Sequence, residues 1–193
     1  MANITAFYFI LLLLFIGIIS SLLYWTLRLG ISPTPTSLKV REKLVLSLPQ
    51  SVNGEIHELG SGWGSLFSII SSRYPSHRFI AHERSPIPRW FSIITNRLSK
   101  KPVIITRLDI FSVDLSNAGL VICYLYPDAM RKLAKHLADQ LPNNCWIISH
   151  TFHLSGWVPV TIDTANDLYK TPIYLYKQPG RHNKTACQLK HSA

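Results

Sequence analysis

The chain has 193 residues, enough for one domain with an appendage but not for two domains of ordinary size. Its formal net charge is +10, from 20 lysines and arginines against 10 aspartates and glutamates, which favours contact with nucleic acid or an anionic membrane surface. The basic residues are scattered, which argues against a dedicated nucleic-acid-binding segment. Cys123, Cys145 and Cys187 have no paired spacing, so neither a disulfide scaffold nor a metal site is expected.

An apolar stretch near the N-terminus, from Ala6 to Leu27, carries no charged residue. At about 1.5 Å per residue, a helix over this stretch is roughly 33 Å long, and the hydrocarbon core of a bilayer is about 30 Å thick. A cleaved signal peptide has a basic start and a shorter apolar region, whereas residues 1–5 carry no basic side chain. We therefore expect residues 1–30 to form a single transmembrane anchor.

Positive charge flanks only the C-terminal end of this stretch. Because positively charged flanks stay in the cytoplasm, we expect the rest of the chain to be cytoplasmic, at the inner membrane if the source is bacterial. An interfacial aromatic belt would include Tyr24 and Trp25. The flanking basic residues are Arg28, Lys39, Arg41 and Lys43.

Beyond a linker at 32–36, strand-like and helix-like segments alternate as far as residue 178. This alternation predicts one α/β domain over residues 31–178, with a mostly parallel sheet of seven strands and helices on both faces. The polar, basic tail at 179–193 is predicted to be disordered. Helices are predicted over Ser37–Leu48, Ser65–Arg73, Pro88–Leu98 and Ala129–Leu141, and strands over Glu55–Leu59, Arg78–His82, Val103–Thr106, Leu120–Leu125, Trp146–Thr151, Val158–Ile162 and Ile173–Tyr176.

The most informative segment joins the first predicted strand to the next helix and reads ELGSGWG, from Glu58 to Gly64. Three alternate glycines at such a turn permit positive φ and let a ligand approach the backbone closely. The following helix would add free N–H donors and a positive dipole. Glu83 ends the next strand, near the spacing at which an acidic residue accepts hydrogen bonds from ribose hydroxyls.

Several readings of this turn compete. A dinucleotide fingerprint requires glycine or alanine where Ser65 stands, and Glu58 would repel a pyrophosphate while attracting a cationic or amino group. A Walker loop is excluded because no Gly-Lys-Ser or Gly-Lys-Thr occurs. A turn that binds no ligand remains an alternative.

The glycine loop, Glu83 and Asp109 in RLDIF together resemble class I S-adenosylmethionine-dependent methyltransferases. Three further segments resemble one branch, which holds small bacterial and archaeal methyltransferases and the membrane-anchored mitochondrial lysine methyltransferases of the FAM173 type. The resemblance covers roughly Ser32 to Lys177 and implies a Rossmann-like fold. The three segments are SPTPTSLKVREKLV, LVICYLYPDAMRKLAKHL and WIISHTFHLSGWVPV.

The resemblance implies S-adenosyl-L-methionine as the cofactor and assigns residue roles by position. Glu58 would lie near the ammonium group, and Glu83 would accept both ribose hydroxyls. Asp109 would accept from the adenine amino group, with Ile110 against the ring, while Thr36 would close over the cofactor. The loop backbone would hold the amino-acid end and the sulfur side of the cofactor, through Gly60, Ser61, Gly62 and Gly64.

The methyl-transfer mouth would be lined by Tyr126 and Pro127, with Asp128 as a base, an orienting group or a carboxylate at a helix N-terminus. The Asn/Asp-Pro-Pro-Tyr/Phe signature of amino-methylating enzymes is absent, because YLYPD occupies that place. The resemblance implies a protein lysine near the membrane as the methyl acceptor. A small-molecule, lipid or RNA acceptor, and a non-catalytic cofactor-binding membrane scaffold, remain alternatives. Nothing in the sequence indicates an oligomeric state.

Overall fold

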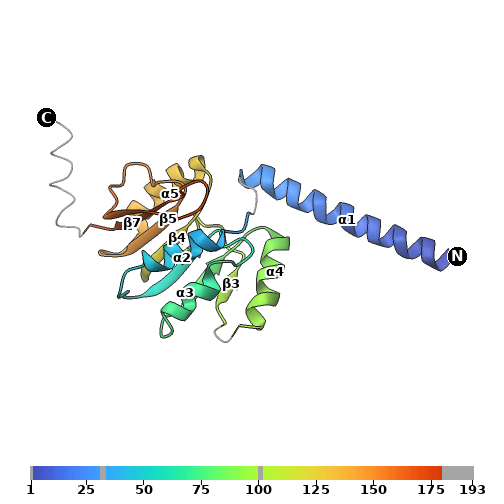
Figure 1. Cartoon of the computed structure of the whole chain (residues 1–193), viewed down its shortest axis with the longest axis horizontal. Helices are drawn as coiled ribbons and strands as arrows, with labels where there is room; N and C mark the ends of the chain where they lie inside the picture. Colours follow the sequence, from blue (N-terminus) through green and yellow to red (C-terminus); the bar gives the residue numbers. More distant parts are fainter. Residues whose placement is uncertain (1, 31–33, 100–101, 180–193) are drawn as a thin grey trace.

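The computed structural model describes residues 2–30, 34–99 and 102–179, so 180–193 of the predicted tail lie outside the described residues. A single long helix, α1 (Ala2–Leu29), extends away from the remainder of the chain (Figure 1). Its segment Ile4–Leu29 has a mean hydropathy of 2.6, and none of it is buried. The predicted apolar helix is therefore present, and it begins four residues before Ala6.

Seven strands form one sheet in the order β3-β2-β1-β4-β5-β7-β6. Neighbouring strands pair in parallel except that β7 pairs antiparallel with both β5 and β6. This arrangement confirms the predicted Rossmann-like, mostly parallel seven-stranded sheet. The strands are β1 (Glu55–Leu59), β2 (Phe79–His82), β3 (Ile104–Thr106), β4 (Ala118–Cys123), β5 (Trp146–His150), β6 (Thr161–Thr164) and β7 (Pro172–Lys177).

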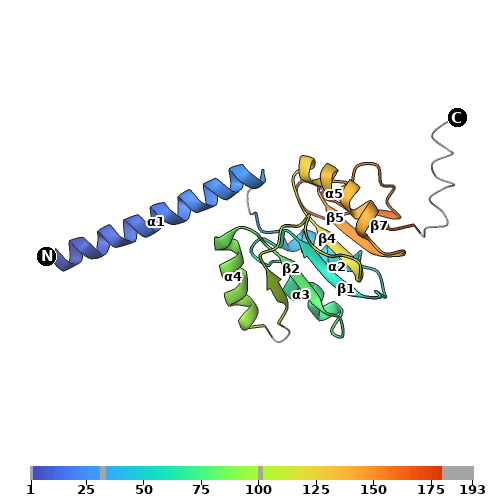
Figure 2. The same ribbon diagram turned by 180° about the vertical axis from the view of Figure 1, so that it is seen from behind.

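Helices lie on both faces of the sheet, as predicted (Figures 1 and 2). One hydrophobic cluster joins the sheet to α2 and α3, through residues such as Leu44 and Phe67. The other joins the opposite face to α5, through residues such as Leu133. Among the described residues, neither cluster contains a residue of α4. The helices are α2 (Leu38–Leu46), α3 (Phe67–Arg73), α4 (Pro86–Arg97) and α5 (Pro127–Gln140).

Most predicted helices and strands differ from the structure by one to three residues at an end, as three elements illustrate. The strand predicted over Leu120–Leu125 is β4, which starts at Ala118 and ends at Cys123. Helix α3 begins at Phe67 rather than Ser65, because Gly64 has a φ of 77° and the chain continues as turns to residue 66. Strand β6 is shifted towards the C-terminus and overlaps the predicted Val158–Ile162 only at its first two residues, since this edge strand is largely exposed and apolar burial does not determine its position.

Helix α5 is, of the described helices, the one that contributes to the second cluster. Loop side chains complete this cover: Leu115 and Leu154 are fully buried, and the Trp157 indole N–H donates to the carbonyl of Ala134 at 3.0 Å. The stability of this face therefore depends strongly on the apolar side of α5.

We predict that Leu133→Ala lowers the free energy of unfolding by about 2–5 kcal/mol, because it leaves a cavity beneath α5. Urea unfolding of the full chain in mild detergent, followed by near-ultraviolet circular dichroism, measures this change. The adjacent Lys132 is exposed, and Lys132→Ala should alter the free energy by less than about 0.5 kcal/mol. Equal effects of the two substitutions would contradict the packing described for α5.

Candidate functional site

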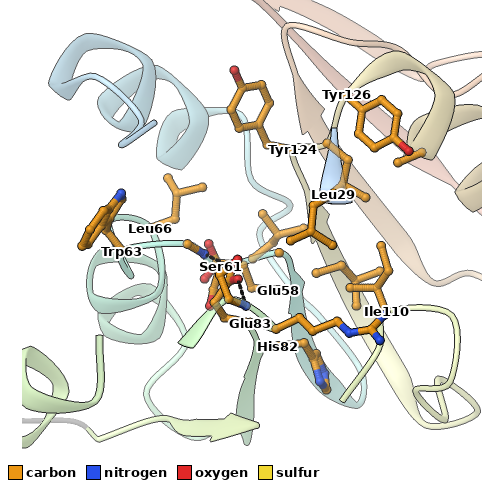
Figure 3. A pocket seen from close by; sticks show the side chains of 18 of the residues that line it. Leu29, Glu58, Ser61, Trp63, Leu66, His82, Glu83, Ile110, Tyr124 and Tyr126 are labelled. Atoms are coloured by element: carbon orange, nitrogen blue, oxygen red, sulfur yellow. Dashed lines mark hydrogen bonds between the residues drawn. The ribbon is translucent and has the colours of Figure 1, made fainter. Parts of the chain in front are cut away.

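A pocket of about 250 Å³ opens at the carboxyl ends of the central strands. It lies where the strand order reverses between β1 and β4, the place where open α/β sheets bind their ligands. Glu58, Ser61 and Glu83 meet at its centre, with Leu66 and Trp63 on one side and Leu29 and Ile110 on the other (Figure 3). Other predicted residues that line it are Thr36, Gly60, Gly62, Asp109 and Tyr126.

The glycine loop turns sharply between β1 and α3. Gly60, Gly62 and Gly64 have φ values of 80°, 54° and 77°, in the left-handed region that favours glycine. A Cβ on Gly64 would lie 2.3 Å from the Phe67 ring, so this position also requires the close approach. The amides of Gly60 and Ser61 both donate to the carbonyl of His82, at 2.9 and 3.0 Å, which ties the loop to β2.

Glu58, at the end of β1, is almost completely buried, and its Oε2 has no hydrogen-bond partner. Burial, reinforced by the negative charge of Glu83, raises the pKa of Glu58 to about 8. The buried Oγ of Ser61 also lacks a partner. Since buried polar atoms are nearly always hydrogen-bonded, these two atoms indicate a place for a ligand that supplies donors and positive charge.

Glu83 follows β2 and holds two backbone amides. Its Oε2 accepts from the Gly62 N–H at 2.7 Å, and its Oε1 accepts from the Ser85 N–H at 2.7 Å. The carboxylate therefore braces the glycine loop from the neighbouring strand. Each oxygen retains a further acceptor position, which a ligand hydroxyl can use.

Asp109 and Ile110 border the same pocket from the segment after β3. The Asp109 carboxylate forms an ion pair with Arg84, and its Oδ1 accepts from the Phe111 N–H at 3.0 Å. Arg84 also lies 6.0 Å from the centre of the Trp25 ring in α1. These contacts connect the pocket border to the last turns of the apolar helix.

The mouth of the pocket combines residues that the sequence predicted with others that it did not. Tyr126 was predicted: it caps the N-terminus of α5 and packs so closely on Gly30 that a Cβ there would lie 2.9 Å from its ring. Tyr124 was not singled out, yet it lines the pocket and stacks on His150 at 4.2 Å between ring centres. The Thr36 hydroxyl lies 3.4 Å from Nε2 of that histidine.

Two predicted catalytic positions lie outside the pocket lining. Pro127 occupies the first turn of α5, where its missing N–H costs no helical hydrogen bond. Asp128 is exposed and forms an ion pair with Arg131, three residues along the same helix. Asp128 is thus a carboxylate in the first turn of α5.

The last turn of α1 contributes Arg28 and Leu29 to the pocket lining, which sequence reasoning did not predict. Both were assigned only to the membrane boundary, because an apolar helix carries no signal for contact with a distant loop. The short linker at 32–36 was the available clue, since it keeps the end of α1 close to the domain.

The fold and the site define the class of the protein. The protein is a class I S-adenosylmethionine-dependent methyltransferase. This class is defined here by the strand order, the glycine loop after β1, and the acidic side chains at the ends of β1 and β2. The family profile of the ANTKMT methyltransferase domain matches residues 58–161. The chain belongs to this family, which comprises S-adenosylmethionine-dependent protein lysine methyltransferases. The search of curated protein sequences gave no match.

Solved structures support the fold. An RNA methyltransferase from Salinibacter ruber in complex with S-adenosyl-L-homocysteine has a TM-score of 0.64 and 24% identity, covering 76% of this chain and 94% of its own. A putative methyltransferase, yhhF, from Escherichia coli has a TM-score of 0.61 and 17% identity, covering 77% and 89%. Magnesium protoporphyrin IX methyltransferase from Synechocystis PCC 6803 with bound cofactor scores 0.54 at 14% identity, covering 72% and 76%. At these identities the likeness shows the fold alone.

We predict that Glu58 makes the protein without cofactor progressively less stable, relative to Glu58→Gln, as the pH rises from about 5 to about 8. The ordinary pKa of Glu58 is 4.5 and its folded pKa is about 8. Between these values the folded state keeps a proton on Glu58 that the unfolded state has released, so the contribution of Glu58 to the free energy of unfolding falls as pH rises. Buried His82 and His150, whose pKa values burial lowers to about 4, contribute in the opposite sense below about pH 6.5 and are common to both proteins. Glu58→Gln should therefore gain stability relative to the unchanged protein across this pH range in thermal unfolding curves. Equal pH slopes for the two proteins would show that Glu58 is not the buried acid.

Proposed function

We propose that α1 anchors this chain in a bilayer and that the domain methylates a lysine of a protein at the same membrane surface. The observation that carries this proposal is the contribution of Arg28 and Leu29 to the pocket, because it joins the end of the apolar helix to the cofactor site. The basic residues that follow Leu27 favour a cytoplasmic domain.

We propose that the cofactor places its ammonium group at Glu58 and its ribose at Glu83. The buried, unpartnered Oε2 of Glu58 supports the first assignment, since a cationic group would supply both the missing hydrogen bond and the missing charge. The Ser61 hydroxyl, also without a partner, is available beside it. Asp109 and Ile110 border the pocket where the adenine would lie, and Thr36 lines it from the linker.

S-adenosylmethionine supplies a methyl group that is already activated on a sulfonium centre. The protein therefore has to align the acceptor nitrogen and exclude water. Leu29, Tyr124 and Tyr126 provide apolar and aromatic walls at the mouth of the pocket. A lysine amine that enters between such walls loses hydration, which lowers its pKa and favours the neutral, nucleophilic form. This chemistry requires no dedicated base, consistent with Asp128 lying outside the pocket lining.

Incubation of the full chain in phospholipid vesicles with methyl-labelled cofactor and membrane proteins should yield labelled methyllysine after acid hydrolysis. We predict that Tyr126→Ala lowers the rate by about tenfold or more, because it removes a wall that aligns the acceptor. Tyr169 is 85% exposed and does not line the pocket, so Tyr169→Ala serves as the matched control. Label found only in lipid would contradict a protein acceptor.

Binding of S-adenosylhomocysteine tests the cofactor assignment separately. We predict that Glu83→Ala weakens binding by about 1–3 kcal/mol, since it removes a charged acceptor and the brace on Gly62. Isothermal titration calorimetry measures the change, with Asp139→Ala, an exposed carboxylate on α5, as the control. Unchanged affinity for Glu83→Ala would mean that the ribose lies elsewhere.

A further inference from the structure

Surface helices usually bury their apolar side and expose their polar side, and helix α4 does the opposite. Pro88, Ser92 and Asn96 form its buried side, and Ser92 is 0% exposed. The Asn96 side chain donates to the Val103 carbonyl at 2.8 Å and accepts from the Val103 N–H at 3.0 Å. Polar hydrogen bonds, rather than apolar packing, therefore attach this helix to the segment leading into β3.

The opposite side of α4 carries large apolar residues that face solvent. Trp90 is 60% exposed, Ile94 58%, and Leu98, the C-cap, 85%. These positions, together with exposed Phe91, follow the helical repeat and share one face. We name Trp90, Phe91, Ile94 and Leu98 the α4 stripe. A domain surrounded only by water gains nothing from such a stripe, so its composition points to an apolar occupant.

We propose that the α4 stripe inserts into the headgroup and upper acyl region of the bilayer that α1 crosses. This inference rests on the anchoring stated under the proposed function. Helix α1 contacts α4, which brings the stripe close to the end of the membrane helix. Figures 1 and 2 show α1 leaving the domain on the side where α4 lies, with α4 running crosswise to it. A helix that crosses the anchor in this way lies along the membrane plane.

The charges of α4 fit a lipid surface. Its charged residues are Arg89, which is half-buried, and Arg97, which is exposed, and no acidic residue accompanies them. An exposed basic side chain beside an apolar face, as Arg97 is beside Trp90, is typical of helices that lie in the interface, where it contacts lipid phosphates. Tryptophan is enriched at this depth because its ring is apolar and its N–H is polar. Arg84 and Ser85, which precede α4, line the pocket, so docking would hold the mouth near the membrane surface.

Depth-dependent quenching in vesicles of phosphatidylcholine and phosphatidylglycerol tests the proposal on the full chain. Cys187 is first replaced by serine, which leaves the buried Cys123 and Cys145. A fluorophore is then attached at Ile94→Cys or, as a control, at Tyr169→Cys. Tyr169 is 85% exposed and lies between β6 and β7, at the sheet edge opposite β3. Retained binding of S-adenosylhomocysteine verifies that each labelled protein is folded.

We predict that a nitroxide on the lipid quenches the label at position 94 by about half or more and leaves the label at position 169 nearly unchanged. Adding Trp90→Glu should restore much of the fluorescence at position 94, because a charge in the stripe opposes insertion.

Equal quenching at the two positions would overturn the proposal. A label at position 94 that is shielded from both lipid nitroxide and aqueous iodide would also overturn it, in favour of a protein partner or a second copy. Alkaline carbonate extraction tests the anchor independently. Release of the chain with lipid quenching retained would refute the spanning helix while leaving the stripe on the membrane.

Discussion

Two carboxylates in one buried pocket are the constraint on which the rest of the site depends. Glu58 ends β1 and Glu83 follows β2, so the pairing of these parallel strands brings two carboxyl groups together, and the pKa of Glu58 rises to about 8 as a result of burial and the charge of Glu83. Glu83 relieves part of the cost by accepting from two backbone amides, whereas Glu58 retains an oxygen without a partner. A cationic ligand group beside Glu58 would favour its ionised form and supply a hydrogen bond to its unpartnered oxygen.

The shape of the glycine loop follows from the same pair. Gly62 donates to Glu83, and the two preceding amides donate to His82, so the loop is attached to β2 rather than to its own helix. Because these bonds require positive φ at Gly60 and Gly62, other side chains would be strained there. The backbone of the loop at the pocket is therefore held in place by the sheet, and α3 behind it is short.

Periodicity predicted the sheet well because buried parallel strands leave a strong signal: all six residues of β4 are buried. The edge strand β6 was displaced because it is mostly exposed. The positions of Glu58 and Glu83 in the pocket followed from strand ends, which sequence reveals. The exposed side of α4 could not be predicted from the sequence, since an apolar stripe at helical spacing indicates a buried side without indicating what buries it. Contacts across distant segments, such as Tyr126 on Gly30, leave no local pattern.

A single spanning helix would by itself leave the attached domain free to rotate and tilt about its linker. Contacts of Arg84 with Trp25 and of Tyr126 with Gly30 restrict that freedom at the end of α1. A second contact through the α4 stripe would remove the remaining tilt and hold the pocket mouth at one height above the lipid. Acceptors at that height would then meet the site at high effective concentration, while proteins in bulk solution would gain nothing from the anchor. Selectivity for lysines near the membrane would arise from this geometry, without a dedicated substrate-recognition insertion in the domain.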